Sequence, residues 1–340
     1  MGASYAYAVG NVRARESSLL TRQDLDQLLV LSGADELLSV LRDKGLGGPP
    51  ADGSAAGMDD LFREETRALW RYLEDITPDF SLYDAFVYRQ DIHNCKAVIK
   101  GVLTGRPYRS LLLEPATVSP DLLEQAVKDR DFSRLPSFLR EAAAKAYDIL
   151  AHASDAQLAD AVLDRAGMAA MLEAAKETKV PMLLELIGTQ VFYADCKIAL
   201  RAARAGKSAA YLEQALCPCP GLDVRVLVSA AAEGPSNGEK AVLERMESLD
   251  VYGSRQAAEI YRESPSAYEK YVDDRVMKTA LKGRAVTLGP EPLLGYFVGR
   301  ETEIKNLHIL FSGLRAGQDE PSIRSRLREP YVPNTAGRTM

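Results

Sequence analysis

The sequence predicts an all-α protein built from three similar helical bundles, and three observations support this fold class. Strand patterns are nearly absent, since no alternating segment rich in Val, Ile and Thr lies between Asn-Gly or Asp-Gly turns. Apolar residues recur instead at three- and four-residue spacing, as at Leu25, Leu28 and Leu29, which is the period of a helix buried on one face. The third observation is a helical pattern that occurs three times along the chain.

The starts and ends of the expected helices can be located from capping residues. Thr21, with Asp24 three residues later, approximates a capping box. Ser119-Pro120 and Ser264-Pro265 each place an N-cap residue before a proline at the first helical position. Helices are expected to end at glycines, which readily adopt positive φ, and the candidates are Gly33, Gly45, Gly105 and Gly206.

Two turn-rich stretches and the C-terminal tail are expected to lie outside the helices. The stretches are residues 45–57 and 233–238, whose small and turn-forming residues are typical of exposed, mobile loops. The tail after Pro330 has no periodicity and is expected to fray, with residues 333–340 disordered.

The repeated pattern is a short motif in a long helix, followed by a glycine ten residues after the central residue of the motif. An apolar segment precedes each copy, and a new helix start follows each glycine. The N-terminal Leu20-Thr21 segment matches those helix starts. The three motifs are Asn94-Cys95-Lys96, Asp195-Cys196-Lys197 and Asn306-Leu307-His308, followed by Gly105, Gly206 and Gly317.

The repeat is longer than the period of a solenoid, and it is offset from the chain ends. The expected units are residues 1–110, 111–216 and 217–332. The chain begins and ends part-way through a unit, so its N-terminal segment is expected to pack with its C-terminal end. We interpret this pattern as three bundles in a pseudo-threefold arrangement, closed as a ring rather than open as an array.

Composition and charge exclude several classes of protein. The net charge is −6 and the sequence pI is near 5.4, whereas a protein that binds nucleic acid would show a basic face. The four cysteines are too few for a disulfide scaffold and suit a reducing cytoplasm. No signal peptide is expected, and the longest apolar stretch, Met182 to Cys196, is interrupted by Glu185 and Asp195. No transmembrane segment is therefore predicted.

Two short motifs resemble parts of known ligand sites but are incomplete. Gly206-Lys207-Ser208 matches the end of a phosphate-binding loop, yet the required earlier glycine is Arg201 and the segment follows a helix. Cys217-Pro218-Cys219 supplies half of a zinc site, with no histidine or second cysteine pair nearby in the sequence. A helix end and a turn explain the two motifs better, so no cofactor or metal is predicted.

Histidines and paired aspartates also fail to form a catalytic pattern. His93, His152 and His308 are isolated, and the expected role of each is a packed or solvated side chain. Asp59-Asp60 and Asp273-Asp274 resemble metal-binding aspartates of helical isoprenoid enzymes, but no third spaced acid follows. Near helix starts such carboxylates complement the helix dipole, which is the explanation preferred here. The sequence therefore predicts a protein that is not an enzyme.

Three segments carry a likeness to a known family, namely Tyr5–Arg15, Asp91–Lys96 and Gly289–Phe297. The last of them continues through Glu301, Glu303, Ile304 and Asn306 to Arg324, Leu327, Arg328 and Tyr331. In their order and spacing these segments resemble the C subunit of the V/A-type rotary ATPases, known as the d subunit in the eukaryotic enzyme. The likeness covers residues 3 to 332, although residues 110–250 share mainly helical organisation.

The resemblance implies a funnel-shaped, non-catalytic socket of three helical units. In such a complex it receives the central-stalk subunits, sits on the membrane proteolipid ring and passes torque between them. The other subunits of the complex would hold it at the cytoplasmic face of the membrane. It would bind neither nucleotide nor ion. Two alternatives stay open: a helical enzyme acting on a small apolar or phosphorylated substrate, and a free-standing helical adaptor.

Nine residues are candidates for contact with partners. The polar residues of the repeated motif either close hydrogen bonds between helices of one unit or line the funnel and its rim; they are Asn94, Lys96, Asp195, Lys197 and Asn306. A basic cluster forms if the chain ends meet, and is either a solvated face or a patch for an acidic partner surface. Its members are Arg13, Arg15, Arg324 and Arg328, with Arg326 beside them.

Overall fold

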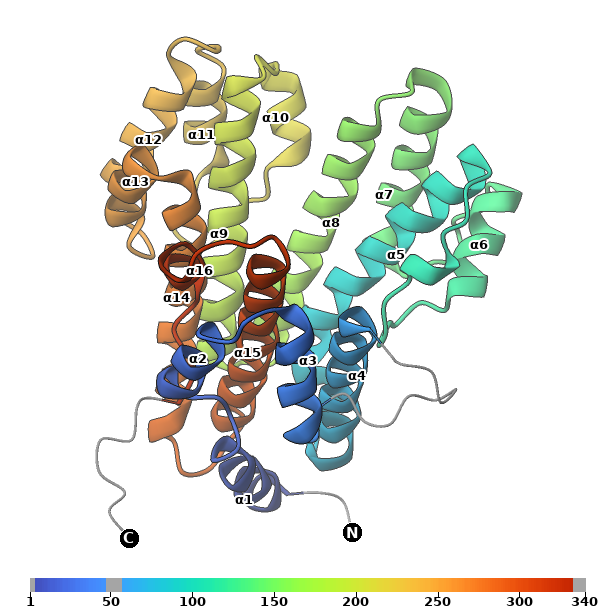
Figure 1. Ribbon diagram of the computed structural model, residues 1–340. Helices are drawn as coiled ribbons and strands as arrows, with labels where there is room; N and C mark the ends of the chain where they lie inside the picture. The colour runs from blue at the N-terminus through green and yellow to red at the C-terminus, as the bar shows by residue number, and fades with distance from the viewer. Residues whose placement is uncertain (1–3, 47–56, 333–340) are drawn as a thin grey trace, which may run out of the picture. The chain divides into compact units, whose positions relative to one another are not determined.

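The structure is a computed structural model that describes residues 4–46 and 57–332. Helices make up its regular secondary structure and these residues contain no strand, which confirms the all-α prediction (Figure 1). The first eight helices are α1 (Tyr5–Glu16), α2 (Arg22–Leu29), α3 (Ala34–Asp43), α4 (Met58–Ile76), α5 (Asp84–Thr104), α6 (Pro120–Asp129), α7 (Ser137–Asp148) and α8 (Ala156–Glu177).

The second half of the chain continues in the same way. Its helices are α9 (Pro181–Arg204), α10 (Ala209–Ala215), α11 (Val224–Ala231), α12 (Gly238–Leu249), α13 (Ser254–Glu263), α14 (Pro265–Ala280), α15 (Glu291–Arg315) and α16 (Glu320–Arg326). Short helical turns join some of them: the 3₁₀ turns η1 (Phe80–Tyr83), η2 (Arg109–Leu111) and η4 (Leu281–Ala285), and the π turn η3 (Ile149–Ala153).

The chain divides into two compact units. The terminal unit combines the residues up to Phe80 with those from Glu259 onward, and the central unit is Ser81–Ala258. In the terminal unit α15 packs against α1, α3, α4, α14 and α16, and α16 also contacts α2. In the central unit α8 packs against α5, α7, α9 and α10, while α9 also contacts α11 and α12. The three-unit division read from the sequence stays a prediction.

The predicted helix starts are confirmed by their capping bonds. The Thr21 hydroxyl accepts a hydrogen bond from the Asp24 N–H at 3.2 Å, and the Asp24 carboxylate accepts one from the Thr21 N–H at 2.8 Å. Ser119 and Ser264 cap α6 and α14, each ahead of a proline. These bonds satisfy backbone donors that the first helical turn leaves without a partner.

Most of the predicted helix ends are correct, and one is wrong. Gly45, Gly105 and Gly206 have φ of 82°, 67° and 62° and follow the ends of α3, α5 and α9. Gly33 instead has an extended backbone with φ of 176° and precedes α3, so it marks a helix start. Glycine is also accepted at N-caps, where no positive φ is needed.

The predicted turn at residues 233–238 joins α11 to α12, whereas the fraying expected after Pro330 is wrong for the first two residues. Tyr331 is only 2% exposed, and Val332 pairs with Thr21 in an isolated parallel bridge. Most of the predicted 45–57 loop and the whole of residues 333–340 lie outside the described part of the chain.

A hydrophobic core joins the two ends of the chain within the terminal unit. It contains residues from α2, α3 and α4 together with residues from α15 and α16, among them Leu25, Leu37, Leu307 and Ile323. The central unit has its own core, formed by α5 to α8. The terminal core explains why residues so far apart in sequence form one compact unit, since each end alone would leave an apolar face exposed.

Candidate functional site

The three repeated motifs occupy equivalent places in the fold, beginning with Asn94 on α5. Its buried amide faces the extended segment that follows η2. Asn94 Oδ1 accepts a hydrogen bond from the Leu113 N–H at 2.8 Å, and Asn94 Nδ2 donates to the Leu113 carbonyl at 2.9 Å. One side chain therefore satisfies both polar groups of one backbone residue, an arrangement that we call a clasp.

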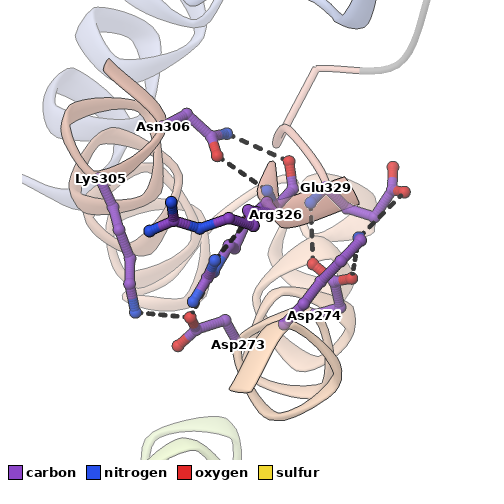
Figure 2. Close-up of polar contacts among 8 residues, drawn as sticks. Asp273, Asp274, Lys305, Asn306, Arg326 and Glu329 are labelled. Carbon is purple, nitrogen blue, oxygen red and sulfur yellow. Dashed lines mark hydrogen bonds and ion pairs between the residues drawn. The ribbon is translucent and has the colours of Figure 1, made fainter. Parts of the chain in front are cut away.

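Asn306 on α15 forms a second clasp with the segment that follows α16. Its Oδ1 accepts from the Arg328 N–H at 2.8 Å, and its Nδ2 donates to the Arg328 carbonyl at 3.1 Å (Figure 2). Asn306 is 1% exposed, so these bonds replace solvation that the backbone groups of this segment would otherwise lack.

Asp195 on α9 occupies the equivalent place in the second motif, but its clasp is incomplete. Asp195 Oδ1 accepts a hydrogen bond from the Cys217 N–H at 3.0 Å, while Oδ2 has no hydrogen-bond partner among the described residues. Burial raises the pKa of the Asp195 carboxyl to about 8, against the opposing effects of the Cys217 N–H and of Arg165. A carboxyl group thus stands where the other two copies carry an amide.

The hydrogen bonds of the three motifs are those expected if these residues join segments within a unit. Asn94, Asp195 and Asn306 are all at most 1% exposed, so their side chains contact the rest of their own unit. Lys96 and Lys197 are only half-buried. The Lys96 ammonium pairs with Asp164 of α8 at 2.6 Å.

In the first and third copies an acidic residue lies one helical turn before the motif. Its carboxylate accepts hydrogen bonds from the backbone just before the next helix, a role that was not predicted from the sequence. Asp91 Oδ1 accepts hydrogen bonds from the Thr117 N–H at 2.9 Å and from the Val118 N–H at 3.0 Å, just before the N-cap of α6. Glu303, also three residues before its motif, accepts from the Leu20 N–H at 2.6 Å, just before the N-cap of α2.

The Glu303 bond gives the segment before α2 the place at α15 that the segment before α6 holds at α5. The Leu20 N–H donates to an acidic residue of α15 as the Val118 N–H donates to one of α5, although 283 residues separate Leu20 from Glu303. The acid and asparagine at three-residue spacing in both copies was the sequence signal that could have revealed this role.

Glu303 also belongs to a buried group of charges. The Arg300 guanidinium pairs with both Glu65 of α4 and Glu303, and the three side chains are 6–13% exposed. Buried charges of this kind need partners at close range, because burial removes the water that would otherwise solvate them. The group connects α4 to α15 inside the terminal unit.

The predicted basic cluster does not form a set of free cations. Arg13 donates to the Gly283 and Val286 carbonyls, each at 2.9 Å, and pairs with Glu16 at 2.8 Å. The Arg15 guanidinium carbon lies 3.7 Å from the centre of the Tyr72 ring. These two arginines thus fix α1 to the rest of the terminal unit.

The C-terminal arginines are engaged in the same manner. Arg324 pairs with Asp26 of α2 and Arg326 donates to Gln318. Arg328 Nε donates to Asp273 Oδ2 at 2.7 Å. The chain ends do meet, as the cluster required, but the arginines are held by carboxylates and carbonyls of their own unit.

Asp273 and Asp274 were expected near a helix start, and this interpretation is wrong. They lie in the second half of α14, where the charge of the helix N-terminus no longer reaches them. Asp273 pairs with Lys305 and Arg328, and Asp274 accepts from Lys270 at 2.5 Å and from the Glu329 N–H at 2.8 Å (Figure 2). Both aspartates hold the segment Leu327–Val332, which we call the C-terminal strap.

Tyr331 anchors the strap in a groove of α15. A β-carbon at Gly295 would lie 2.6 Å from the Tyr331 hydroxyl oxygen, and one at Gly299 would lie 2.7 Å from the Tyr331 β-carbon. Both positions thus need glycine for the ring to approach the helix. The Tyr331 hydroxyl contacts Glu16 Oε1 at 3.1 Å, so the anchor also reaches α1.

The incomplete ligand motifs have structural roles. Gly206 follows α9, and Ser208 caps the short α10 by accepting from the Tyr211 N–H. All four cysteines are free. Over residues 4–46 and 57–332, no group of three or more His, Cys, Asp or Glu side chains could hold a metal ion. Within the same residues, no helix is both long enough and apolar enough to cross a membrane.

The described side chains define a structural α-helical protein in which buried polar groups join segments distant in sequence. The chain belongs to the ATP synthase (C/AC39) subunit family, whose model matches residues 8–326. It is therefore a structural subunit of the V/A-type ATP synthase class rather than its catalytic subunit.

Relatives from three organisms match over most of their length. The chain is 21% identical over 322 residues to the C subunit of the V-type sodium ATPase of Enterococcus hirae, covering 94% of this chain and 97% of the relative. It is 25% identical over 338 residues to the C subunit of the V-type ATP synthase of Thermus thermophilus, with 95% and 99% covered. The C subunit of the A-type ATP synthase of Methanocaldococcus jannaschii is 25% identical over 356 residues, with 96% and 86% covered.

Proposed function

We propose that the chain is a central-rotor socket that couples the stalk of a V/A-type ATPase to the membrane proteolipid ring. The observation that carries the proposal is the match to the C/AC39 family over residues 8–326. In the proposed assembly the chain is peripheral on the inner face of the membrane and serves ATP-linked transport of protons or sodium. The relative from Enterococcus hirae is named as a subunit of a sodium ATPase.

The internal construction of the chain supports a part that bears torque. Such a part must transmit force without deforming, which favours packed helices joined by short, specific bonds over a mobile cleft. The clasps of Asn94 and Asn306 and the buried Arg300 group are bonds of this type. We propose further that the expected three-unit arrangement provides the socket.

The candidate residues proposed to contact partners are those whose side chains are at least partly exposed. Asn94, Asp195, Asn306 and Arg328 are buried in their own unit, so their proposed role is to keep the socket rigid. Arg15 is exposed, and Arg13, Lys96, Lys197 and Arg324 are half-buried. These five cations are the ones proposed to face acidic surfaces of the stalk or the ring.

The test is reconstitution of the complex from its own organism, with and without this chain, in sealed vesicles. With the chain present, ATP hydrolysis by the head is expected to drive ion uptake, and an inhibitor of the ring should also stop hydrolysis. Without it, hydrolysis should continue but uptake and inhibitor sensitivity should be lost. Unchanged uptake without the chain, or recovery of the chain apart from stalk and ring in native extracts, contradicts the proposal.

A charge variant tests the partner surface separately. Lys197→Gln removes an accessible cation of α9, and Glu173→Gln, on an exposed side chain of α8, is the matched control. Lys197→Gln is expected to weaken assembly, and more so at low salt, where charge pairing is strongest. Equal assembly of both variants would remove Lys197 from the proposed contact.

A further inference from the structure

The strongest observation that the proposed function leaves unused is the difference between the Asp195 clasp and its two counterparts. Asn94 and Asn306 each offer one acceptor and one donor, and each uses both on a single backbone residue. Asp195 offers an acceptor to the Cys217 N–H, but as a carboxylate it has no donor for a carbonyl. Its second oxygen is buried without a hydrogen-bond partner in the described structure.

We propose that Asp195 is a protonated side chain at neutral pH and acts as a pH-sensitive latch on residues 216–222. A proton on Oδ2 supplies the donor that Asn94 and Asn306 carry as Nδ2, and the Cys217 carbonyl is the equivalent acceptor. Loss of that proton leaves a buried negative charge whose Oδ2 has no donor among the described residues, and the segment opens to let water reach it.

The groups around Asp195 favour the neutral form. The cation Arg165 on α8 acts in the other direction and stabilises the carboxylate form of Asp195. The Arg165 Nε donates to the Leu216 carbonyl at 2.9 Å. From α9 and from the clasped segment, the neighbours are the thiols of Cys196, Cys217 and Cys219. Among the described residues, α10, α11 and α12, which also pack on α9, add no charge that acts on Asp195.

Those thiols are neutral as well. Burial raises the pKa of Cys217 and of Cys219 to about 12, and the Asp195 charge acts in the same direction. The pKa of the fully buried Cys196 is raised well above its usual value for the same reason. Within the described part of the chain, Arg165 is thus the one charged group that stabilises the carboxylate form of Asp195. Burial outweighs it, and the Asp195 pKa of about 8 agrees with the geometry.

The direction of the pH effect follows from proton binding. The closed segment holds the proton up to the raised pKa, whereas the open, solvated carboxyl releases it near the usual value of an aspartate. Between these two limits the closed state binds more protons than the open state, so rising pH favours opening. The population of the open segment is expected to increase by up to about tenfold per pH unit and then level off.

The experiment is backbone amide hydrogen exchange of residues 216–222 in the full chain from pH 5 to pH 9, corrected for the chemical exchange rate. Wild type is expected to lose protection as pH rises. Asp195→Asn, which carries the amide of the other copies, should stay protected with little pH dependence. Asp160→Asn, on the solvent-accessible side of α8, is the control and should behave like wild type.

The reciprocal variant keeps the test decisive even if Asp195→Asn fails to fold. Asn94→Asp places a carboxyl in the first clasp, and residues 111–115 should then acquire the pH-dependent opening that wild type lacks there. The nearby Asp91 carboxylate acts in the same direction. The latch is overturned by identical pH profiles for wild type and Asp195→Asn at 216–222, or by protection at 111–115 that stays independent of pH in Asn94→Asp. Neither outcome depends on assembly with a rotary complex, so the latch and the proposed function can fail separately.

Discussion

Asn306 holds both backbone polar groups of Arg328, which lies 22 residues further along the chain. The contact fixes the start of the C-terminal strap on α15 and repeats the contact of Asn94 with Leu113 in the central unit. Each of these asparagines does the same work for its unit: its buried amide satisfies both backbone polar groups of one residue in the segment that it holds.

Asn306→Ala removes both bonds and leaves the Arg328 N–H and carbonyl buried without partners. The expected loss is about 2–4 kcal/mol in the free energy of unfolding, measured by urea denaturation. Asn11→Ala is the control, because Asn11 Nδ2 also donates to a backbone carbonyl but on the surface of α1, and it should change stability much less. Equal effects of the two variants would show that the Asn306 clasp contributes little.

Gly299→Ala places a methyl group against the rigid Tyr331 side chain, with the β-carbon and the first ring carbon both 2.7 Å away. Ring or helix must shift, and the expected cost is about 1–3 kcal/mol. Gly10→Ala is a matched helical control with nothing within 4 Å of the new β-carbon, and it should stabilise α1 by up to about 1 kcal/mol. Thermal unfolding should show a lower melting temperature for Gly299→Ala and a higher one for Gly10→Ala. A higher melting temperature for Gly299→Ala would contradict the close packing of Tyr331 on α15.

Arg300→Gln leaves Glu65 and Glu303 buried beside one another with no cation between them. Breaking a buried pair in this way is expected to cost about 3–5 kcal/mol near pH 7. Urea denaturation near pH 7 measures the loss, with Arg71→Gln, which breaks an exposed pair with Glu64, as a control of little effect. Equal losses for Arg300→Gln and Arg71→Gln would contradict the prediction.

The double variant Asp273→Asn, Asp274→Asn removes the carboxylates that hold the C-terminal strap. Both aspartates are partly exposed, so their effect on global stability is expected to be modest, below about 1 kcal/mol per pair. Local opening of the strap should increase, and trypsin should cleave after Arg326 and Arg328 several-fold faster than in wild type. Asp60→Asn, at an exposed pair with Arg63 on α4, is the control. Unchanged cleavage would mean that Asn306 and Tyr331 hold the strap without the aspartates.

Features set by local sequence were the ones that could be predicted. The capping box at Thr21, the caps at Ser119 and Ser264 and the positive φ of Gly105 depend on a few neighbouring residues, and those residues stand beside each other in the sequence. The repeat likewise placed Asn94, Asp195 and Asn306 at equivalent positions. Their equivalent bonds follow from that shared register.

Features set by distant contacts could not be predicted. Asp273 and Asp274 were assigned to a helix start because no neighbouring residue indicates that the C-terminal strap binds to α14. The burial of Tyr331 depends on Gly295 and Gly299 of another helix. The arginines were read as free charges because Asp26, the partner of Arg324, lies 298 residues away in sequence. Sequence reasoning thus found the positions but not their partners.

The shared core of the two chain ends has a consequence for synthesis on the ribosome. The central unit, Ser81–Ala258, is continuous and can fold as soon as it has emerged. The first eighty residues cannot complete their unit until the strap that ends at Val332 has been made. At typical translation rates this leaves α2, α3 and α4 without their partner helices for roughly 10–50 s. During that time their apolar faces are exposed, so the N-terminal segment is where a chaperone would be expected to bind the nascent chain.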